Sequence, residues 1–296
     1  MRESWYGKYI GEAIGVFIIV FFGCGILFDA FMYNTVPGLL DGGLAWGFAV
    51  ALAVYAGASM SGAHFNPAVT LALAVTKRFP WSQVIQYWIA QIVGGFLGAL
   101  ALVALFGDAV KAFADKNNIV FGQPGSEKIA AMLIPESPHP YLVGIGQAAY
   151  DQVPIWRGFL TESLATALLL IFILMLLETR SVNAPSGWFF PLALGVGVCM
   201  LVMVTAPLTM TSLNPARDLG PRIMLLLWGF GSQAFPGIRD GGSLLVTVGG
   251  PLVGGVVGAL FFDYVMKPFY PRLAAQVPSG EHAPAGREVP AASGRR

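Results

Sequence analysis

Charged side chains are scarce in this sequence. Asp, Glu, Lys and Arg make up only 11% of its 296 residues, whereas soluble domains carry about 25%. Hydrophobic residues account for 56%, and the mean hydropathy is +0.68. Because so few charges cannot cover the surface of a water-soluble domain, this composition predicts a protein that crosses a membrane several times.

Cysteine and net charge are also low. The two cysteines, Cys24 and Cys199, both lie in apolar runs, which favours small core residues over a disulfide or a metal site. The formal net charge is +1, and no basic stretch is interleaved with aromatic residues, so we expect no nucleic-acid partner. Since we also find no nucleophile–base pair and no metal-ligand cluster, we predict that the protein is not an enzyme and uses no cofactor or metal.

Long apolar runs are what the chain has in abundance. A membrane-spanning helix needs about 20 apolar residues at a rise of about 1.5 Å per residue. Six runs are long enough to form one, and they predict an all-α polytopic membrane protein with six transmembrane helices. These runs are residues 8–30, 42–60, 81–106, 156–177, 188–208 and 243–265.

Two further apolar segments begin with Asn-Pro-Ala. Asn66 precedes the segment 67–76, and Asn214 precedes the segment 215–230, which Gly220-Pro221 interrupts. Asn before Pro is typical of a helix start, with Asn as the N-cap and Pro at the first helical position. The first segment spans about 15 Å, half of a membrane core of about 30 Å. We therefore predict two re-entrant half-helices, the second broken at Gly220-Pro221.

The two halves of the chain repeat this arrangement. Glu12 lies 54 residues before Asn66, and Glu162 lies 52 residues before Asn214. Because each half has three crossings, the second copy must start on the opposite face of the membrane, which makes an inverted repeat. We predict one channel domain over residues 1–267, with repeats at about 5–106 and 155–267 joined by an outer loop at 107–155. The half-helices then meet N-terminus to N-terminus near the midplane.

Lysine and arginine indicate the orientation. Basic residues precede the first span, lie between the second and third and between the fourth and fifth, and follow the sixth, whereas the loop between the first two spans has none. The positive-inside rule then predicts that both termini are cytoplasmic, in a plasma or inner membrane. Residues 268–296, rich in Pro, Ala, Gly and Ser, are expected to form a disordered cytoplasmic tail.

The residues at the start of each half-helix carry the chemistry of the predicted pore. Two opposed helix N-termini, each with about half a positive charge, make the midplane hostile to cations. The amides of Asn66 and Asn214 can donate to a passing oxygen; the alternative is that both are only N-caps. Non-helical backbone at membrane depth must be buried or line a wet path. We therefore expect pore-lining carbonyls from Gly62, Ala63, His64, Phe65, Met210, Thr211 and Ser212.

Ionisable residues at membrane depth leave alternatives open. Arg217 costs about 2.5–3.5 kcal/mol on insertion scales, so it should face the pore, or else pair with Asp218. Glu12 and Glu162 either accept backbone N–H bonds that support the unwound loops or form the ion path of a coupled transporter. Their symmetric placement favours support, a role we also give to Asp218. His64 either lines the pore or packs beside it.

At these motifs the sequence resembles the major intrinsic proteins. The resemblance rests on residues 61–70 and 214–222 and covers nearly all of residues 5–267. Asp218, Arg222 and Pro251-Leu252 resemble the aquaglyceroporin branch, the glycerol facilitators. The resemblance implies an aquaporin-like fold, a homotetramer with one pore per subunit, and passive conduction of water and small uncharged solutes without protons or ions. Its motif residues here are Asn66, Pro67, Ala68, Asn214, Pro215 and Ala216.

The resemblance also implies a selectivity filter outside the midplane, formed by Trp46, Val202, Thr211 and Arg217. Glycerol facilitators carry Trp, Gly, Phe and Arg at these points, so Val202 and Thr211 depart from their pattern. The set is similar to that of plant nodulin-26-like channels, which pass glycerol and some neutral metalloid acids. It implies an amphipathic pore with one apolar wall, Trp46, wide enough for a linear polyol.

We therefore expect a passive channel in a lipid bilayer for glycerol, other small neutral solutes and water. A water-selective or neutral metalloid channel is the alternative within this class. A coupled secondary transporter is the alternative of another class, because such proteins also use inverted repeats and broken helices. It would show saturable, gradient-driven uptake that depends on Glu12 or Glu162.

Overall fold

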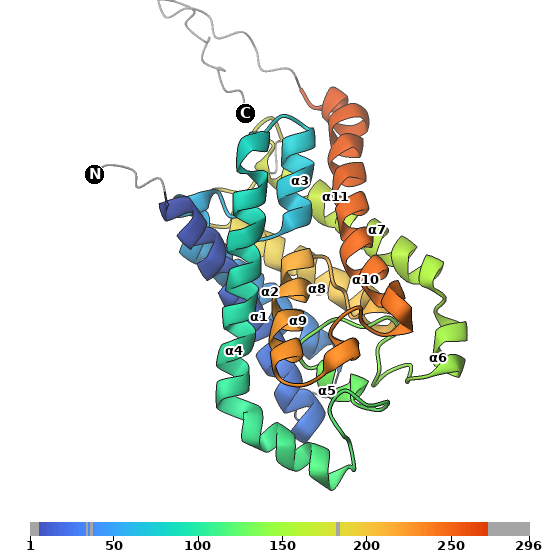
Figure 1. Ribbon diagram of the computed structural model, residues 1–296. Coiled ribbons are helices and arrows are strands. Elements are labelled where there is room, and N and C mark those ends of the chain that lie inside the picture. Colours follow the sequence, from blue (N-terminus) through green and yellow to red (C-terminus); the bar gives the residue numbers. More distant parts are fainter. Residues whose placement is uncertain (1–5, 34, 36–37, 182–183, 272–296) are drawn as a thin grey trace, which may run out of the picture.

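Six long helices form a bundle in the computed structural model, which describes residues 6–33, 35, 38–181 and 184–271 (Figure 1). Within these residues, six helices are long and apolar enough to cross a membrane. The predicted spans are confirmed, except that the third helix continues about ten residues beyond its predicted end. The helices are α1 Gly7–Tyr33, α2 Leu39–Ser61, α4 Val84–Lys116, α7 Ile155–Leu177, α8 Phe190–Thr209 and α11 Gly250–Phe261.

The sixth span is longer than α11 alone. It begins at α10 (Gly242–Leu244), passes through a π-helical stretch at Leu245–Gly249, and ends with π- and 3₁₀-helical turns at Phe262–Met266 and Lys267–Phe269. Most of the predicted tail, residues 272–296, lies outside the described residues.

Two short helices fill the middle of the bundle. α3 (Pro67–Val75) and α9 (Pro215–Leu227) each follow an Asn N-cap in extended conformation. In Figure 1, α3 lies in one half of the bundle and α9 in the other. The predicted break at Gly220-Pro221 is wrong, because α9 runs through both residues. Gly220 instead lets α9 lie against α4: a Cβ there would lie 2.5 Å from the backbone nitrogen of Phe96.

Glycines set the helix spacing in both halves. A Cβ on Gly94 of α4 would overlap the carbonyl of Ala13 on α1, and one on Gly254 of α11 would overlap that of Ser163 on α7. Small residues at such points let helix backbones approach closely where no hydrophobic effect drives association.

The same device joins the short helices to the other half. Gly95 of α4 packs on the Ala216 carbonyl of α9, and Gly255 of α11 packs on the Ala68 carbonyl of α3. Matched contacts of this kind in both halves are what a structural repeat requires.

The linking segment, defined as residues 117–154, is more deeply placed than its sequence suggested. It contains two short helices, α5 Glu127–Ala130 and α6 Gln147–Gln152. Its apolar run 129–134 is at most 1% exposed. The expected outer loop is therefore not wholly on the outside, since its run 129–134 is buried in the protein.

Candidate functional site: a cavity where the two short helices meet

The N-termini of α3 and α9 meet through their capping residues. Asn66 Oδ1 accepts from Ala68 N at 2.8 Å, and Asn214 Oδ1 accepts from Ala216 N at 2.9 Å. Each Asn amide also donates across the junction: Asn66 Nδ2 to the Leu213 carbonyl at 2.8 Å, and Asn214 Nδ2 to the Phe65 carbonyl at 2.7 Å. Each side chain therefore caps its own helix and also joins that helix to the loop that precedes the other short helix.

These amides keep some donor capacity. An amide nitrogen carries two hydrogens, and each Nδ2 makes one hydrogen bond within the described residues. Asn66 and Asn214 both line the cavity described below. The second hydrogen of each amide is therefore available to a solute oxygen.

The loops before the two helices hold strained backbone. Five of the nine described non-glycine residues with positive φ lie in these loops: Ala63, Phe65, Met210, Thr211 and Leu213. Such conformations cost about 1–3 kcal/mol each and persist only where the surroundings hold them.

Two buried carboxylates hold the loops. Glu12 accepts from the backbone nitrogens of His64 at 3.0 Å and Phe65 at 2.6 Å. Glu162 accepts from those of Ser212 at 2.8 Å and Leu213 at 2.9 Å. Since the N–H groups point to the carboxylates, the carbonyls of the same segments are left to face away from them.

A buried glutamine that sequence reasoning missed holds the Glu12 carboxylate in place. Gln91 Nε2 donates to Glu12 Oε2 at 2.7 Å and to Thr70 Oγ1 at 3.0 Å. Thr70 Oγ1 lies 3.1 Å from His64 Nδ1. A polar residue within the apolar run of α4 was the signal that could have identified Gln91.

Asp218 has a partner other than the one considered. Arg222 Nε donates to Asp218 Oδ1 at 2.6 Å, and both side chains are fully buried. Thr247 Oγ1 donates to Asp218 Oδ2, and the Thr247 carbonyl accepts from Ser212 Oγ at 2.7 Å. Asp218 thus reaches the loop through Thr247, and the alternative of an Arg217–Asp218 ion pair is wrong.

Arg217 is held by neutral groups. Its guanidinium carbon lies 4.6 Å from the centre of the Trp46 ring, a cation–π geometry. Its Nη1 donates to the Leu133 carbonyl at 3.1 Å, while Nε and Nη2 are buried without a partner among the described residues. An unpaired buried donor is costly. A solute oxygen that accepted hydrogen bonds from these two nitrogens would remove that cost.

Leu133 was not identified from sequence. It lies in the inserted run of the linking segment, and its carbonyl accepts from Cys24 Sγ at 3.2 Å as well as from Arg217. Any residue could provide this carbonyl, so residue type gave no signal. The apolar run at 129–134 was the available indication that this segment is buried.

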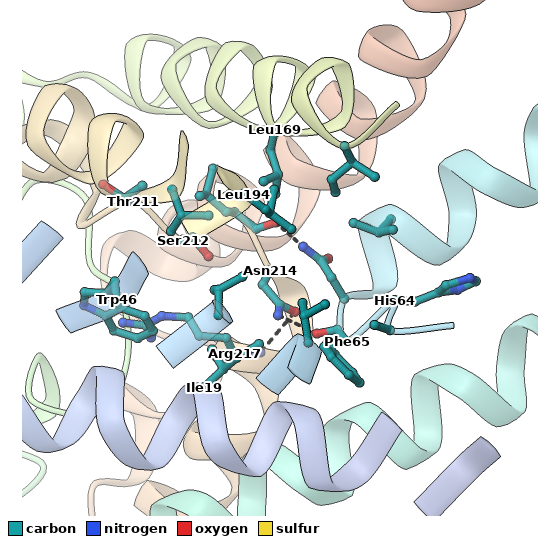
Figure 2. Close-up of a pocket in the computed structure, with 18 of the residues that line it drawn as sticks. Ile19, Trp46, His64, Phe65, Leu169, Leu194, Thr211, Ser212, Asn214 and Arg217 are labelled. Atoms are coloured by element: carbon teal, nitrogen blue, oxygen red, sulfur yellow. Dashed lines mark hydrogen bonds between the residues drawn. The ribbon is translucent and has the colours of Figure 1, made fainter. Parts of the chain in front are cut away.

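These groups surround a narrow cavity of about 80 Å³. A cavity needs about 10–15 Å³ of such volume to hold one water, so several waters or one small solute fit in this one. Figure 2 shows Trp46 and Arg217 towards one end and His64 towards the other, with Asn214 between them. Much of the lining is apolar: Ile19, Val50, Val54, Val69, Leu169, Ile173, Leu194 and Val198.

The four proposed filter residues come together at one end. Trp46, Val202, Thr211 and Arg217 all line the cavity. Trp46 and Val202 also line a wider vestibule of about 390 Å³. The two spaces therefore adjoin at Trp46 and Val202, and it is there that the proposed filter would form a constriction.

The loop residues predicted to provide pore-lining carbonyls do not all line the cavity. Ala63, His64, Phe65, Thr211 and Ser212 line the cavity. Met210 lines the vestibule instead, and Gly62 is among the lining residues of neither space. The His64 ring also packs on Phe79 and Tyr87, so it both lines the cavity and packs beside it.

The vestibule contains a histidine from the linking segment. Burial lowers the pKa of His139 from its ordinary 6.5 to about 4. Its Nδ1 accepts from the Tyr141 backbone nitrogen at 3.1 Å, and the ring packs near Phe31 and Tyr141. His139 is neutral at physiological pH and adds no charge to the mouth of the cavity.

Comparison with known proteins agrees with this geometry. Residues 1–262 match the model of the family described as Major intrinsic protein. The chain is similar to the propanediol uptake facilitator PduF of Citrobacter freundii, with 32% identity over 90% of this chain and 94% of that protein. It is equally similar, at 32% identity, to the glycerol uptake facilitator protein of Pseudomonas aeruginosa, over 92% of this chain and 93% of that one.

A solved structure shares the fold. The aquaglyceroporin from Plasmodium falciparum superposes with a TM-score of 0.75 and 23% identity, covering 90% of this chain and 98% of that one.

Proposed function

This chain belongs to the major intrinsic protein family, whose members are channels and not enzymes, and on that premise we propose that it passively conducts glycerol, other small uncharged solutes and water. Relatives of at least 30% identity are named as facilitators of glycerol and of propanediol. The observation that carries the proposal is the cavity itself, which combines buried unpaired donors with a largely apolar lining. A polyol needs both, because its hydroxyls and its carbons lie on different sides.

The path of a solute follows from the donors and acceptors in order. In the vestibule it meets Trp46, whose ring takes the carbon side. Arg217 Nε and Nη2 then donate to its oxygens, and the loop carbonyls accept from its hydroxyls. The free amide hydrogens of Asn66 and Asn214 donate next. Each contact replaces part of the hydration shell, and none is strong enough to trap the solute.

Cations are excluded by fixed positive charge. Arg217 carries a full charge at the constriction, and the N-termini of α3 and α9 each carry about half a charge where they meet. A hydrated proton or sodium ion would meet both in sequence, whereas a neutral solute is not repelled.

The roles of Glu12 and Glu162 favour a channel over a coupled transporter. Each carboxylate already accepts two backbone N–H groups, and neither residue lines the cavity. Groups committed to holding backbone are poorly suited to binding and releasing a coupling ion.

The assembly and orientation are part of the proposal. The start of α1 and the end of the sixth span lie towards the same end of the bundle (Figure 1), which supports placing both termini on one side, the cytoplasmic one by the distribution of basic residues. Many large apolar side chains are exposed on the outer surface, among them Val196, Val204 and Leu227; lipid, and the contacts of a homotetramer, would cover them.

The test is stopped-flow light scattering on proteoliposomes, with water and glycerol gradients applied to one preparation. We expect rapid glycerol-driven reswelling that does not saturate and does not depend on a pH or sodium gradient. Fast water flux without glycerol flux would indicate a water-selective pore. Saturable uptake that requires an ion gradient would favour a coupled transporter, and flux of boric acid alone would favour a metalloid channel.

A further inference from the structure

Thr205, a residue outside the filter, makes two hydrogen bonds that cannot both use its proton. Its Oγ1 lies 2.9 Å from the Leu201 carbonyl and 2.9 Å from Thr211 Oγ1. Because a carbonyl can only accept, both contacts are hydrogen bonds at the same time only when the single hydroxyl hydrogen of Thr205 points to Leu201. Thr205 Oγ1 then has only lone pairs for Thr211, and Thr211 must be the donor between the two hydroxyls.

The consequence is a fixed polarity at Thr211. Its hydrogen is committed to Thr205, so what it offers to the cavity that it lines is lone pairs alone. Arg217 is the reverse, because a guanidinium has donors only and its Nε and Nη2 are unpaired among the described residues. Figure 2 shows Thr211 on one side of the cavity, with Trp46 and Arg217 on the other.

We propose that Thr205 is a specificity-determining residue that acts through Thr211. By holding the Thr211 hydrogen, it makes the filter an acceptor on one side and a donor on the other. Such a filter favours solutes that carry an O–H or N–H donor beside an acceptor oxygen, such as vicinal diols, over solutes of equal size that can only accept. The proposal rests on the proposed channel function.

Thr205 can have this role because it is behind the filter. It does not line the cavity or the vestibule, so it touches no solute. It lies on α8 three residues after Val202, which does line both spaces. Its effect on a solute must therefore be indirect, and a substitution there changes none of the residues that line the two spaces.

The experiment compares Thr205→Val, which keeps the shape and removes the hydroxyl, with Thr205→Ser, which restores it. Glycerol and water permeabilities are measured on the same proteoliposomes. In Thr205→Val we expect the glycerol-to-water ratio to fall by about two- to tenfold, the range that one net hydrogen bond gives. Thr205→Ser should keep the ratio of the unmodified protein.

Two further measurements separate recognition from structure. Thr211→Val should lower the ratio as Thr205→Val does, and adding Thr205→Val to Thr211→Val should change nothing more. The protein-mediated preference for propane-1,3-diol over its isomer 2-methoxyethanol, which has one hydroxyl donor fewer at equal size, should also shrink in Thr205→Val.

Different results would contradict the role of Thr205 and the proposed channel function. Equal losses of glycerol and water flux in Thr205→Val would mean that Thr205 only supports the fold, and so would an additional loss in the Thr211→Val background. An unmodified protein that conducts no glycerol would overturn the proposed glycerol conduction itself, which is a different result from either of these.

Discussion

At the scale of single residues, the position of the Trp46 ring depends on one glycine. Trp46 lines both the cavity and the vestibule, and its ring lies on Gly23 of α1. A Cβ on Gly23 would overlap that ring, since three ring atoms lie within 2.7 Å of the position it would take. The absence of a side chain on α1 therefore determines where the ring can be.

Replacing Gly23 with alanine should move Trp46 and change selectivity. We expect a glycerol-to-water permeability ratio altered by about twofold or more, because an ångström-scale displacement at a binding site has large effects on rate. Gly25→Ala is the matched control, since its Cβ would meet only Leu102 at an ordinary 3.4 Å. Identical ratios in both variants would show that the ring position does not matter.

Replacing Arg217 with valine should admit cations. The constriction would lose its full charge and keep only the partial charges of the helix N-termini. Leu133 keeps a donor in Cys24 Sγ, so the variant should fold. Proton and sodium leak into proteoliposomes, followed with a pH-sensitive dye and by sodium uptake, should rise about tenfold or more, as loss of roughly 1.4 kcal/mol of barrier would give. A folded variant with unchanged leak would leave Arg217 with a structural role alone.

At the scale of elements, the two short helices are held by their surroundings and not by their own length. Helices of 9 and 13 residues are marginal in isolation. The capping amides join them across the junction, and Glu12 and Glu162 hold the strained loops before them. Loss of one support should therefore be felt at the junction.

Glu162→Ala should be strongly destabilising. It leaves the backbone N–H groups of Ser212 and Leu213 buried without partners, at about 1–3 kcal/mol each. Thermal unfolding in detergent should show a lower Tm than in Asp108→Ala, which removes an exposed ion pair with Lys111 and should change Tm little. Equal Tm values would mean that Glu162 does not support the loop.

The linking segment should give the protein a pH-dependent stability. The pKa of His139 is about 4 in the folded protein and near its ordinary 6.5 when unfolded, so the unfolded state binds more protons between these values. The contribution of His139 is complete above about pH 6.5 and is lost as the pH falls towards 4; its upper bound is about 3 kcal/mol. Tm measured against pH should fall less steeply in His139→Asn, and an identical slope would exclude His139 as the cause.

At the scale of the whole molecule, the repeat made the fold predictable from sequence. Run length located the spans, and the paired Asn-Pro-Ala segments located both short helices, because these signals are local. The predicted break at Gly220-Pro221 was wrong because tertiary contact decides it: α4 packs closely on α9 at Ala216 and at Gly220. The helix propensities of Gly220 and Pro221 contain no information about that contact.

The site could be predicted in part for the same reason. Arg217, Asn66 and Asn214 are identified by residue type and spacing, and Glu12 and Glu162 by their symmetric positions. Leu133 and Thr205 are not, because what each contributes is a backbone carbonyl or the direction of one proton. The pairing of Asp218 with Arg222 also required the folded geometry, since two arginines stand close to it in sequence.

The inserted run of the linking segment has a consequence for how such a pore could be built. Duplicating either half of the gene would reproduce three spans, a capped short helix and its supporting glutamate. It would not reproduce the carbonyl of Leu133 beside Arg217, because that carbonyl belongs to neither copy. The end of the cavity where we propose the filter is therefore the part that duplication alone cannot supply. On that proposal, a split or permuted version of this protein must keep the linking segment intact to keep its selectivity.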